Sequence, residues 1–151
     1  MGEIVTLRGV VDSDLAVFFE QQADGVSSGM AGVAVRSEED FEGHWERIRG
    51  DGSVYLRCMV LGGDVVGHLV SWEVQGRRFV GYWVGRGFWG RGIASMALGE
   101  FLGCVLERPL YARVSFENWG SIRVLEKNGF SMLPLDGEVP GVKDFVLLGV
   151  E

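Results

Sequence analysis

The chain has 151 residues, a length typical of one domain, and we expect a single domain over residues 1–151. Its formal net charge of −7 argues against nucleic acid and anionic membranes as partners, because both bind basic surfaces. No apolar run approaches the ~20 residues that span a bilayer, and the first residues lack the basic start of a signal peptide. The two cysteines, Cys58 and Cys104, lie in apolar segments, so we expect a cytoplasmic protein with both as core residues.

Strand and helix signals alternate in the first third of the chain. The elements expected there are a strand at 4–11, a helix from Asp12 or Ser13 through Gln22, a loop at 24–36 and a helix from 37 to 50. Asp and Ser are the residue types that cap helix starts. The segment 24–36 is rich in Gly, Ser and Ala without a clear period, which favours a loop.

The middle of the chain is rich in strand signals, and the last third mixes strands with helices. The expected strands are 54–61, 65–74, 77–84, 110–116, 130–135 and 144–150, and the expected helices are 93–107 and 118–128. Two glycine turns join the first three strands, which predicts an antiparallel meander. The apolar face expected for the helix 93–107 consists of Ile93, Met96, Ala97, Phe101 and Cys104.

The resulting order of elements is β-α-α-β-β-β-α-β-α-β-β. The strand–helix–strand unit from Arg77 to Phe116 requires a parallel pair inside an otherwise antiparallel sheet. We therefore predict an α/β (α+β) fold with a mixed, mostly antiparallel sheet of about seven strands and helices on both faces.

A glycine-rich turn precedes the helix at 93. The stretch Trp89-Gly90-Arg91-Gly92-Ile93-Ala94 places glycines where the helix begins, and a helix start offers unpaired N–H groups and partial positive charge. A diphosphate fits such a site, and Arg86 and Arg91 would add charge. The alternative is a turn that only joins a strand to a helix.

Two motifs together resemble a known family. Gly81-Tyr82-Trp83 and Trp89-Gly90-Arg91-Gly92 come before the helix at 93, and Asn118-x-x-Ser121 followed by Leu125-Glu126-Lys127-Asn128-Gly129-Phe130 comes after it. This pattern resembles the GNAT acetyltransferase superfamily, and within it most closely the ribosomal-protein N-terminal (alanine/serine) acetyltransferases. The resemblance implies a GNAT-like fold, acetyl-CoA as cosubstrate, no metal, and a primary amine as acceptor. It leaves a homodimer open.

The resemblance also implies how acetyl-CoA is held. The backbone of Trp83, Val84 and Gly85 would lie along the pantetheine arm, and one of their N–H groups would polarise the acetyl carbonyl. Asn118 would contact the pantetheine, or would simply cap the following helix. The residues expected around the pyrophosphate are Trp89, Gly90, Arg91, Gly92, Ile93, Ala94 and Ser95.

The catalytic acid of many relatives is missing. They carry a tyrosine that protonates the leaving thiolate, and Leu125 stands at that position here. Ser121 lies one helical turn earlier on the same face, so it is the candidate acid. The alternative for Ser121 is a small residue that packs against the sheet.

The usual base is missing as well. Relatives place a carboxylate where Arg78 and Phe79 stand here, which leaves Glu73 and His68 as weak candidates. Glu73 can instead form a cross-strand pair with Arg78, and His68, which the turn register places opposite Trp83, can be a packed core residue. Glu138 and Asp144 are further candidates.

The implied reaction is direct attack of an amine on the thioester. The acceptor is expected to be a protein N-terminus or a small amine, and the negative net charge mildly favours a cationic one. The expected acceptor pocket is walled by residues 25–35 with Trp45, Trp72 and Tyr82, although aromatic residues at such spacings also pack cores. A non-catalytic acyl-CoA-binding regulatory module is the alternative, because the usual acid and base are absent. A structural domain whose turn binds nothing is a third.

Overall fold

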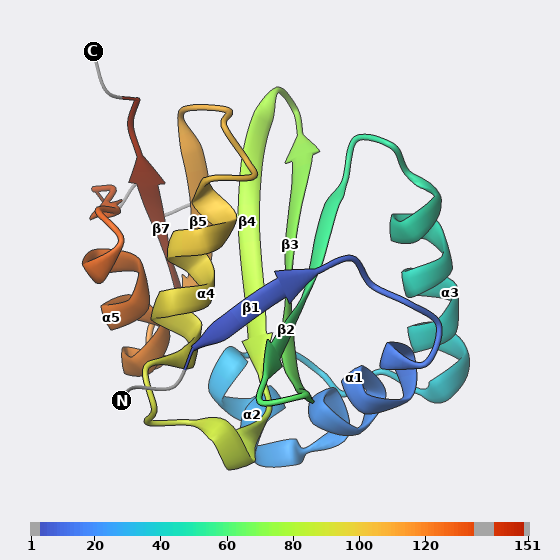
Figure 1. The fold of residues 1–151 in the computed structure, drawn as a ribbon. Helices are drawn as coiled ribbons and strands as arrows, with labels where there is room; N and C mark the ends of the chain where they lie inside the picture. The colour runs from blue at the N-terminus through green and yellow to red at the C-terminus, as the bar shows by residue number, and fades with distance from the viewer. Residues whose placement is uncertain (1–3, 135–140, 150–151) are drawn as a thin grey trace.

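The computed structural model describes residues 4–134 and 141–149. These form one seven-stranded sheet in the order β1-β2-β3-β4-β5-β7-β6 (Figure 1). The strands are β1 (Val5–Arg8), β2 (Tyr55–Leu61), β3 (Asp64–Val74), β4 (Arg77–Val84), β5 (Leu110–Ser115), β6 (Ser131–Met132) and β7 (Val142–Leu147). The helices are α1 (Asp14–Ala23), α2 (Gly25–Ala31), α3 (Glu38–Gly50), α4 (Ile93–Leu102) and α5 (Trp119–Lys127), with a short 3-10 helix η1 at Arg86–Phe88.

The predicted mixed sheet is confirmed. Strands β4 and β5 pair in parallel, as the strand–helix–strand unit requires, and the other pairings of the described strands are antiparallel. Strand β6 is shorter than predicted, and β7 begins two residues before the predicted start and ends at Leu147. Positions 135 and 150 of those predictions lie outside the described residues, as does most of the loop at 136–141. None of the described helices is long and apolar enough to cross a membrane.

The loop predicted at 24–36 is wrong, because helix α2 occupies Gly25–Ala31. The Asp24 side chain accepts a hydrogen bond from the Val26 amide at its start, and Gly32, at φ +74°, closes its end. The buried Ser28 hydroxyl donates to the Gln22 carbonyl. Small polar residues therefore tie this helix to α1, so it shows no apolar period.

Helix α4 is shorter than predicted. It ends at Leu102 rather than at residue 107. The Arg108 guanidinium donates to the carbonyl of Leu102 and to that of Val105, three residues after the helix end. Met96 and Cys104, predicted on its apolar face, are exposed. The prediction of Cys104 as a core residue is therefore wrong, whereas Cys58 is buried as expected.

The start of α1 also differs from the prediction. The Ser13 side chain makes no capping hydrogen bond. Instead Asp14, which is 2% exposed, accepts from the Val11 amide at 2.8 Å and pairs with Arg8 through two hydrogen bonds. The hydrogen bond from Arg8 is the main reason that the pKa of Asp14 is lowered.

Two hydrophobic clusters pack on the sheet. Helices α4 and α5 supply Ile93, Phe101 and Leu125 to the larger cluster, and α1 and α3 supply Phe18, Phe41 and Trp45 to the smaller one. Figure 1 shows α4 and α5 grouped beside β4 and β5, and α1 and α3 on the β2–β3 side.

The β3–β4 register follows from its turn. Gln75 and Gly76 have φ values of +51° and +80°, as two-residue hairpin turns require, and the pairs Glu73–Arg78 and His68–Trp83 are opposite each other as predicted. Strand β4 therefore pairs with β3 over its whole length. In contrast, β4 pairs with β5 only at Arg78 and Phe79.

Gly67 allows β3 to approach β4 closely beside Trp83, because a Cβ at Gly67 would collide with the Trp83 carbonyl oxygen. We expect Gly67→Ala to lower the free energy of unfolding by about 1–3 kcal/mol or more. Gly52→Ala is the control, since no protein atom lies within 4 Å of a Cβ there. Urea unfolding measures both. Equal stability of the two variants would contradict the close approach.

His68 gives a second prediction. Its ring lies 4.7 Å from that of Phe18 and 5.0 Å from that of Trp45, its Nδ1 is buried without a partner, and burial lowers its pKa to about 3. Below about pH 6.5 His68 binds a proton in the unfolded chain but not in the folded chain. The free energy of unfolding therefore falls as the pH is lowered, by at most about 1.4 kcal/mol per pH unit.

Replacement His68→Phe should flatten this fall in the free energy of unfolding between pH 6.5 and pH 5. His44→Gln is the comparison, because the pKa of the less buried His44 is lowered in the same direction, so this variant measures the share of the slope that comes from the other histidine. Chemical unfolding at several pH values measures the slope. An unchanged slope in His68→Phe would show that His68 is not the group that titrates.

Candidate functional site

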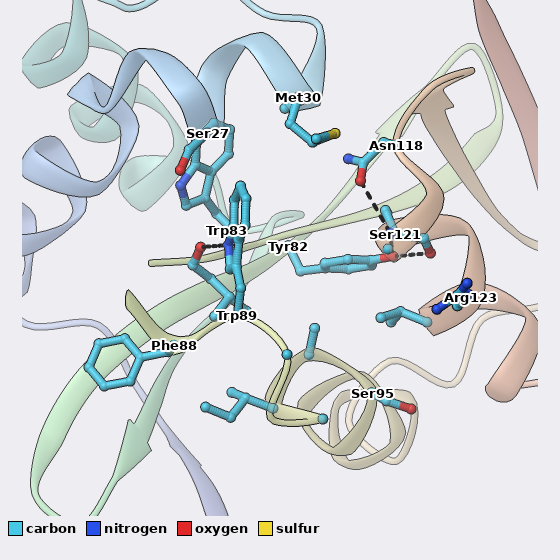
Figure 2. Close-up of a pocket in the computed structure, with 18 of the residues that line it drawn as sticks. Ser27, Met30, Tyr82, Trp83, Phe88, Trp89, Ser95, Asn118, Ser121 and Arg123 are labelled. Carbon is cyan, nitrogen blue, oxygen red and sulfur yellow. Dashed lines mark hydrogen bonds between the residues drawn. The ribbon is translucent and has the colours of Figure 1, made fainter. Parts of the chain in front are cut away.

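A cavity of about 500 Å³ lies where four segments of the chain meet. They are α2, the end of β4, the turn that leads into α4, and α5 (Figure 2). The predicted site residues that line it are Trp83, Val84, Trp89, Gly90, Gly92, Ile93, Ala94, Ser95, Asn118 and Ser121. The structure therefore brings together two motifs that are separated by about thirty residues in the chain.

The other predicted site residues lie outside the lining of this cavity. The Arg86 guanidinium lies 3.4 Å from Asp24, and Arg86 and Gly85 line a separate hollow next to α1. The Arg91 guanidinium lies 5.7 Å from the centre of the Phe88 ring.

The turn before α4 has the backbone shape that a phosphate site needs. Gly90 and Gly92 have φ values of +79° and +74°, which side chains other than glycine rarely tolerate. Gly92 is the N-cap of α4, and no side chain caps the helix from there. The first-turn residues Ile93, Ala94 and Ser95 line the cavity, so the positive end of α4 faces it.

The end of β4 offers further backbone donors. The Gly85 amide donates to the Val66 carbonyl at 2.8 Å, and in an antiparallel pair this alternation directs the amide of Trp83 toward β3 as well. The amides of Tyr82 and Val84 therefore point to the other side, where pairing with β5 has ended. The Val84 carbonyl accepts from the Trp89 indole at 2.9 Å, which ties the turn to the strand.

Three polar side chains meet at the start of α5. Asn118 Oδ1 accepts from the Ser121 amide at 3.2 Å, so the capping role of Asn118 is confirmed. Tyr82 reaches across from β4, and its hydroxyl oxygen lies 2.7 Å from Ser121 Oγ and 3.1 Å from the Ser121 carbonyl oxygen (Figure 2). Burial raises the pKa of Tyr82 to about 12. Leu125 is fully buried in the core.

Two positively charged side chains that the sequence did not predict at this site also line the cavity. Arg123 and Lys127 on α5 both line it. Their spacing of four residues, which places them on one face of the helix, was the available signal. The sequence did not show which face of α5 would turn toward α4.

The base candidates lie away from this cavity. Glu73 is exposed, and it pairs in register with Arg78, five residues before Trp83, which corresponds to about 17 Å along the strand. The Arg78 guanidinium binds Glu107 at 3.1 Å rather than Glu73.

The remaining candidates are placed as follows. His68 packs between rings of the smaller cluster, and Asp144 pairs with Arg113 at 2.7 Å. Glu138 lies outside the described residues. Trp45 is buried in the core and Trp72 stacks on Phe79, whereas Tyr82 does line the cavity.

Solved structures share this architecture. Spermidine N-acetyltransferase from Vibrio cholerae, in complex with CoA and spermine, superimposes with a TM-score of 0.81 at 15% identity, covering 95% of this chain and 95% of that one. The aminoglycoside acetyltransferase AAC(6')-Ib, in complex with coenzyme A, gives 0.79 at 19% identity over 95% and 94%. RimL, a ribosomal L7/L12 alpha-N-protein acetyltransferase in complex with coenzyme A, gives 0.78 at 17% identity over 96% and 94%.

These likenesses show the fold, and they spread over several acetyltransferases rather than one branch. No curated protein matches the chain by sequence. The family model described as Acetyltransferase (GNAT) domain matches residues 5–131. The chain therefore belongs to the GNAT acetyltransferases.

Proposed function

We propose that this protein is an N-acetyltransferase that moves an acetyl group from acetyl-CoA to a primary amine. The observation that carries the proposal is the cavity at the start of α4, where uncapped helix amides, positive-φ glycines and the cations of α5 converge. Each of these features favours an anionic ligand, and together they suit a diphosphate.

The diphosphate would lie against the first turn of α4. Gly90 and Gly92 allow the backbone to approach it closely, and the amides of Ile93 to Ser95 would donate to it. Arg123 and Lys127 would add charge from the opposite wall. Arg86 is held by Asp24 and lines the other hollow rather than this cavity, so we assign it no phosphate contact.

The thioester would lie at the end of β4. The Val84 amide points away from β3 at this level and would polarise the acetyl carbonyl. A preorganised donor of this kind contributes roughly 2.7–4 kcal/mol to acyl transfer. Ser121, at the start of α5, would donate a hydrogen bond to the sulfur of the leaving thiolate.

An attacking amine must lose its proton, because an ammonium has no free electron pair. Glu73, His68 and Asp144 all lie away from the lining of the cavity, so we assign the base to none of them. We propose that the proton leaves through water.

The acceptor would approach from the side of α2. Ser27, Met30 and Ala31 line the cavity there, within the segment expected to wall the acceptor pocket. The similar structures include a spermidine N-acetyltransferase in complex with spermine and a ribosomal L7/L12 alpha-N-protein acetyltransferase. A small amine or a protein N-terminus is therefore the proposed acceptor, and the net charge of −7 favours a cationic one.

We expect the protein with acetyl-CoA to release thiol and form an N-acetyl product with at least one primary amine. A suitable panel contains a polyamine, an aminoglycoside, and peptides that begin with Ala or Ser. The trimethylated form of each active amine is the matched control, since it has no electron pair to attack with. Binding of CoA in calorimetry without any acetylated product would instead support the non-catalytic regulatory module.

Gly92→Ala should weaken CoA binding by about tenfold or more, which corresponds to 1.4 kcal/mol. Gly76→Ala is the matched control: Gly76 has a similar φ of +80° but lies in the β3–β4 turn, and neither glycine has protein atoms within 4 Å of a built Cβ. Both variants should lose about 1–2 kcal/mol of stability through the left-handed backbone. Equal CoA affinity of the Gly92→Ala and Gly76→Ala variants in calorimetry would mean that Gly92 is only a turn glycine.

A further inference from the structure

Two hydroxyl groups from different elements meet in the cavity. Tyr82 extends from β4 and Ser121 lies in the first turn of α5, with 2.7 Å between their hydroxyl oxygens (Figure 2). Both residues line the cavity. The Tyr82 hydroxyl is also 3.1 Å from the Ser121 carbonyl oxygen, which can only accept.

The two hydroxyl protons have two possible arrangements among these oxygens. In the first, Tyr82 donates to the Ser121 carbonyl and Ser121 donates to Tyr82, so neither proton faces the cavity. In the second, Tyr82 donates to Ser121 Oγ, and the Ser121 proton is free to point into the cavity. Only the two O–H bonds rotate between the arrangements, and no heavy atom moves.

We propose that Tyr82 is a positioning residue that turns the Ser121 hydroxyl toward the thioester sulfur as negative charge develops there. This inference rests on the proposed acetyltransferase function. An anion in the cavity favours the second arrangement, because the Ser121 proton then binds a charged acceptor while Tyr82 satisfies the Ser121 oxygen. Hydrogen bonds in such a chain strengthen one another.

The proton balance needs no ionised tyrosine. The C–N bond forms, the C–S bond breaks with its electron pair going to sulfur, the nitrogen releases one proton to water, and the sulfur takes one from water. Ser121 and Tyr82 donate hydrogen bonds and keep their protons. Because burial raises the pKa of Tyr82 to about 12, it remains a donor at the pH values where amines react.

The Tyr82–Ser121 pair also explains how the site can serve the thiolate although position 125 is a leucine. This residue stands where the resemblance expects the tyrosine that serves the thiolate, and it is fully buried against the core. The phenol of Tyr82 comes instead from the neighbouring strand, and it acts through Ser121.

The test compares Tyr82→Phe, Ser121→Ala and the double variant. Tyr55→Phe is the matched control, because its hydroxyl bonds Glu107 at 3.0 Å, its ring also packs on the larger cluster, and it does not line the cavity. Ser121→Ala should lower kcat about ten- to hundredfold, the effect of one hydrogen bond to a charged group. Tyr82→Phe should lower kcat about fivefold, the effect of one neutral hydrogen bond.

In both variants the KM for acetyl-CoA should stay within about twofold, and the double variant should be no slower than Ser121→Ala, since the two residues act as one unit. Multiplying effects would mean that Tyr82 acts independently of Ser121. An unchanged kcat in Tyr82→Phe, or a change in KM alone, would also overturn the inference.

A second measurement does not depend on turnover. The pKa of the thiol of bound CoA, followed by the ultraviolet absorbance of its thiolate, should rise by about one unit in Ser121→Ala and by a smaller amount in Tyr82→Phe. Tyr55→Phe should leave it unchanged. Tight CoA binding with one thiol pKa in all variants would overturn the role of Tyr82 while the proposed function stands. Absence of CoA binding in the native protein would refute both.

Discussion

Strand β4 keeps one partner over its whole length and loses the other after two residues. Its pairing with β3 runs from Arg77 to Val84, whereas its pairing with β5 covers only Arg78 and Phe79. Backbone groups on the β5 side of β4 are therefore without a strand partner from about Tyr82 onward. This single asymmetry creates an edge inside the sheet, where an extended ligand can bind as another strand would.

The surrounding elements are arranged around that edge. The chain leads from it through η1 and the turn at Trp89 to Gly92 into α4, and uncapped helix amides line the same cavity as the strand end. Helix α5 begins on the other side, with Asn118 capping it and Ser121 facing Tyr82. One cavity thus places uncapped helix amides beside a backbone amide without a strand partner and a pair of hydroxyl groups, and the proposed acetyl transfer rests on this set of groups.

The sequence was informative where local rules decide the structure. The turn at Gly90 and Gly92 could be predicted, because other residues rarely adopt the left-handed φ that both positions have. The short turn at Gln75-Gly76 sets the strand register, which places His68 opposite Trp83. Helix α2 could not be read, because buried serines and a Gly-rich composition show no apolar period. Local sequence signals therefore predict single elements and the turns next to them.

Side-chain contacts between elements far apart in the chain could not be predicted from the sequence. The contact of Tyr82 with Ser121 joins residues 39 apart, and it depends on the rotation of α5 about its axis. That rotation also decides that Arg123 and Lys127 face the cavity, whereas Arg86, in η1, is held by Asp24. The position of a charged residue near a motif in the sequence therefore did not show whether its side chain lines the cavity.

The central claim is that the interrupted edge of β4 and the start of α4 hold a CoA thioester. Amide hydrogen exchange with and without CoA, resolved by residue, tests it most directly. The account predicts slowed exchange at Val84 and at residues 92–95, with the amides of the distant β3–β4 turn unchanged. Slowed exchange elsewhere, with no protection at Val84 and the start of α4, would contradict it.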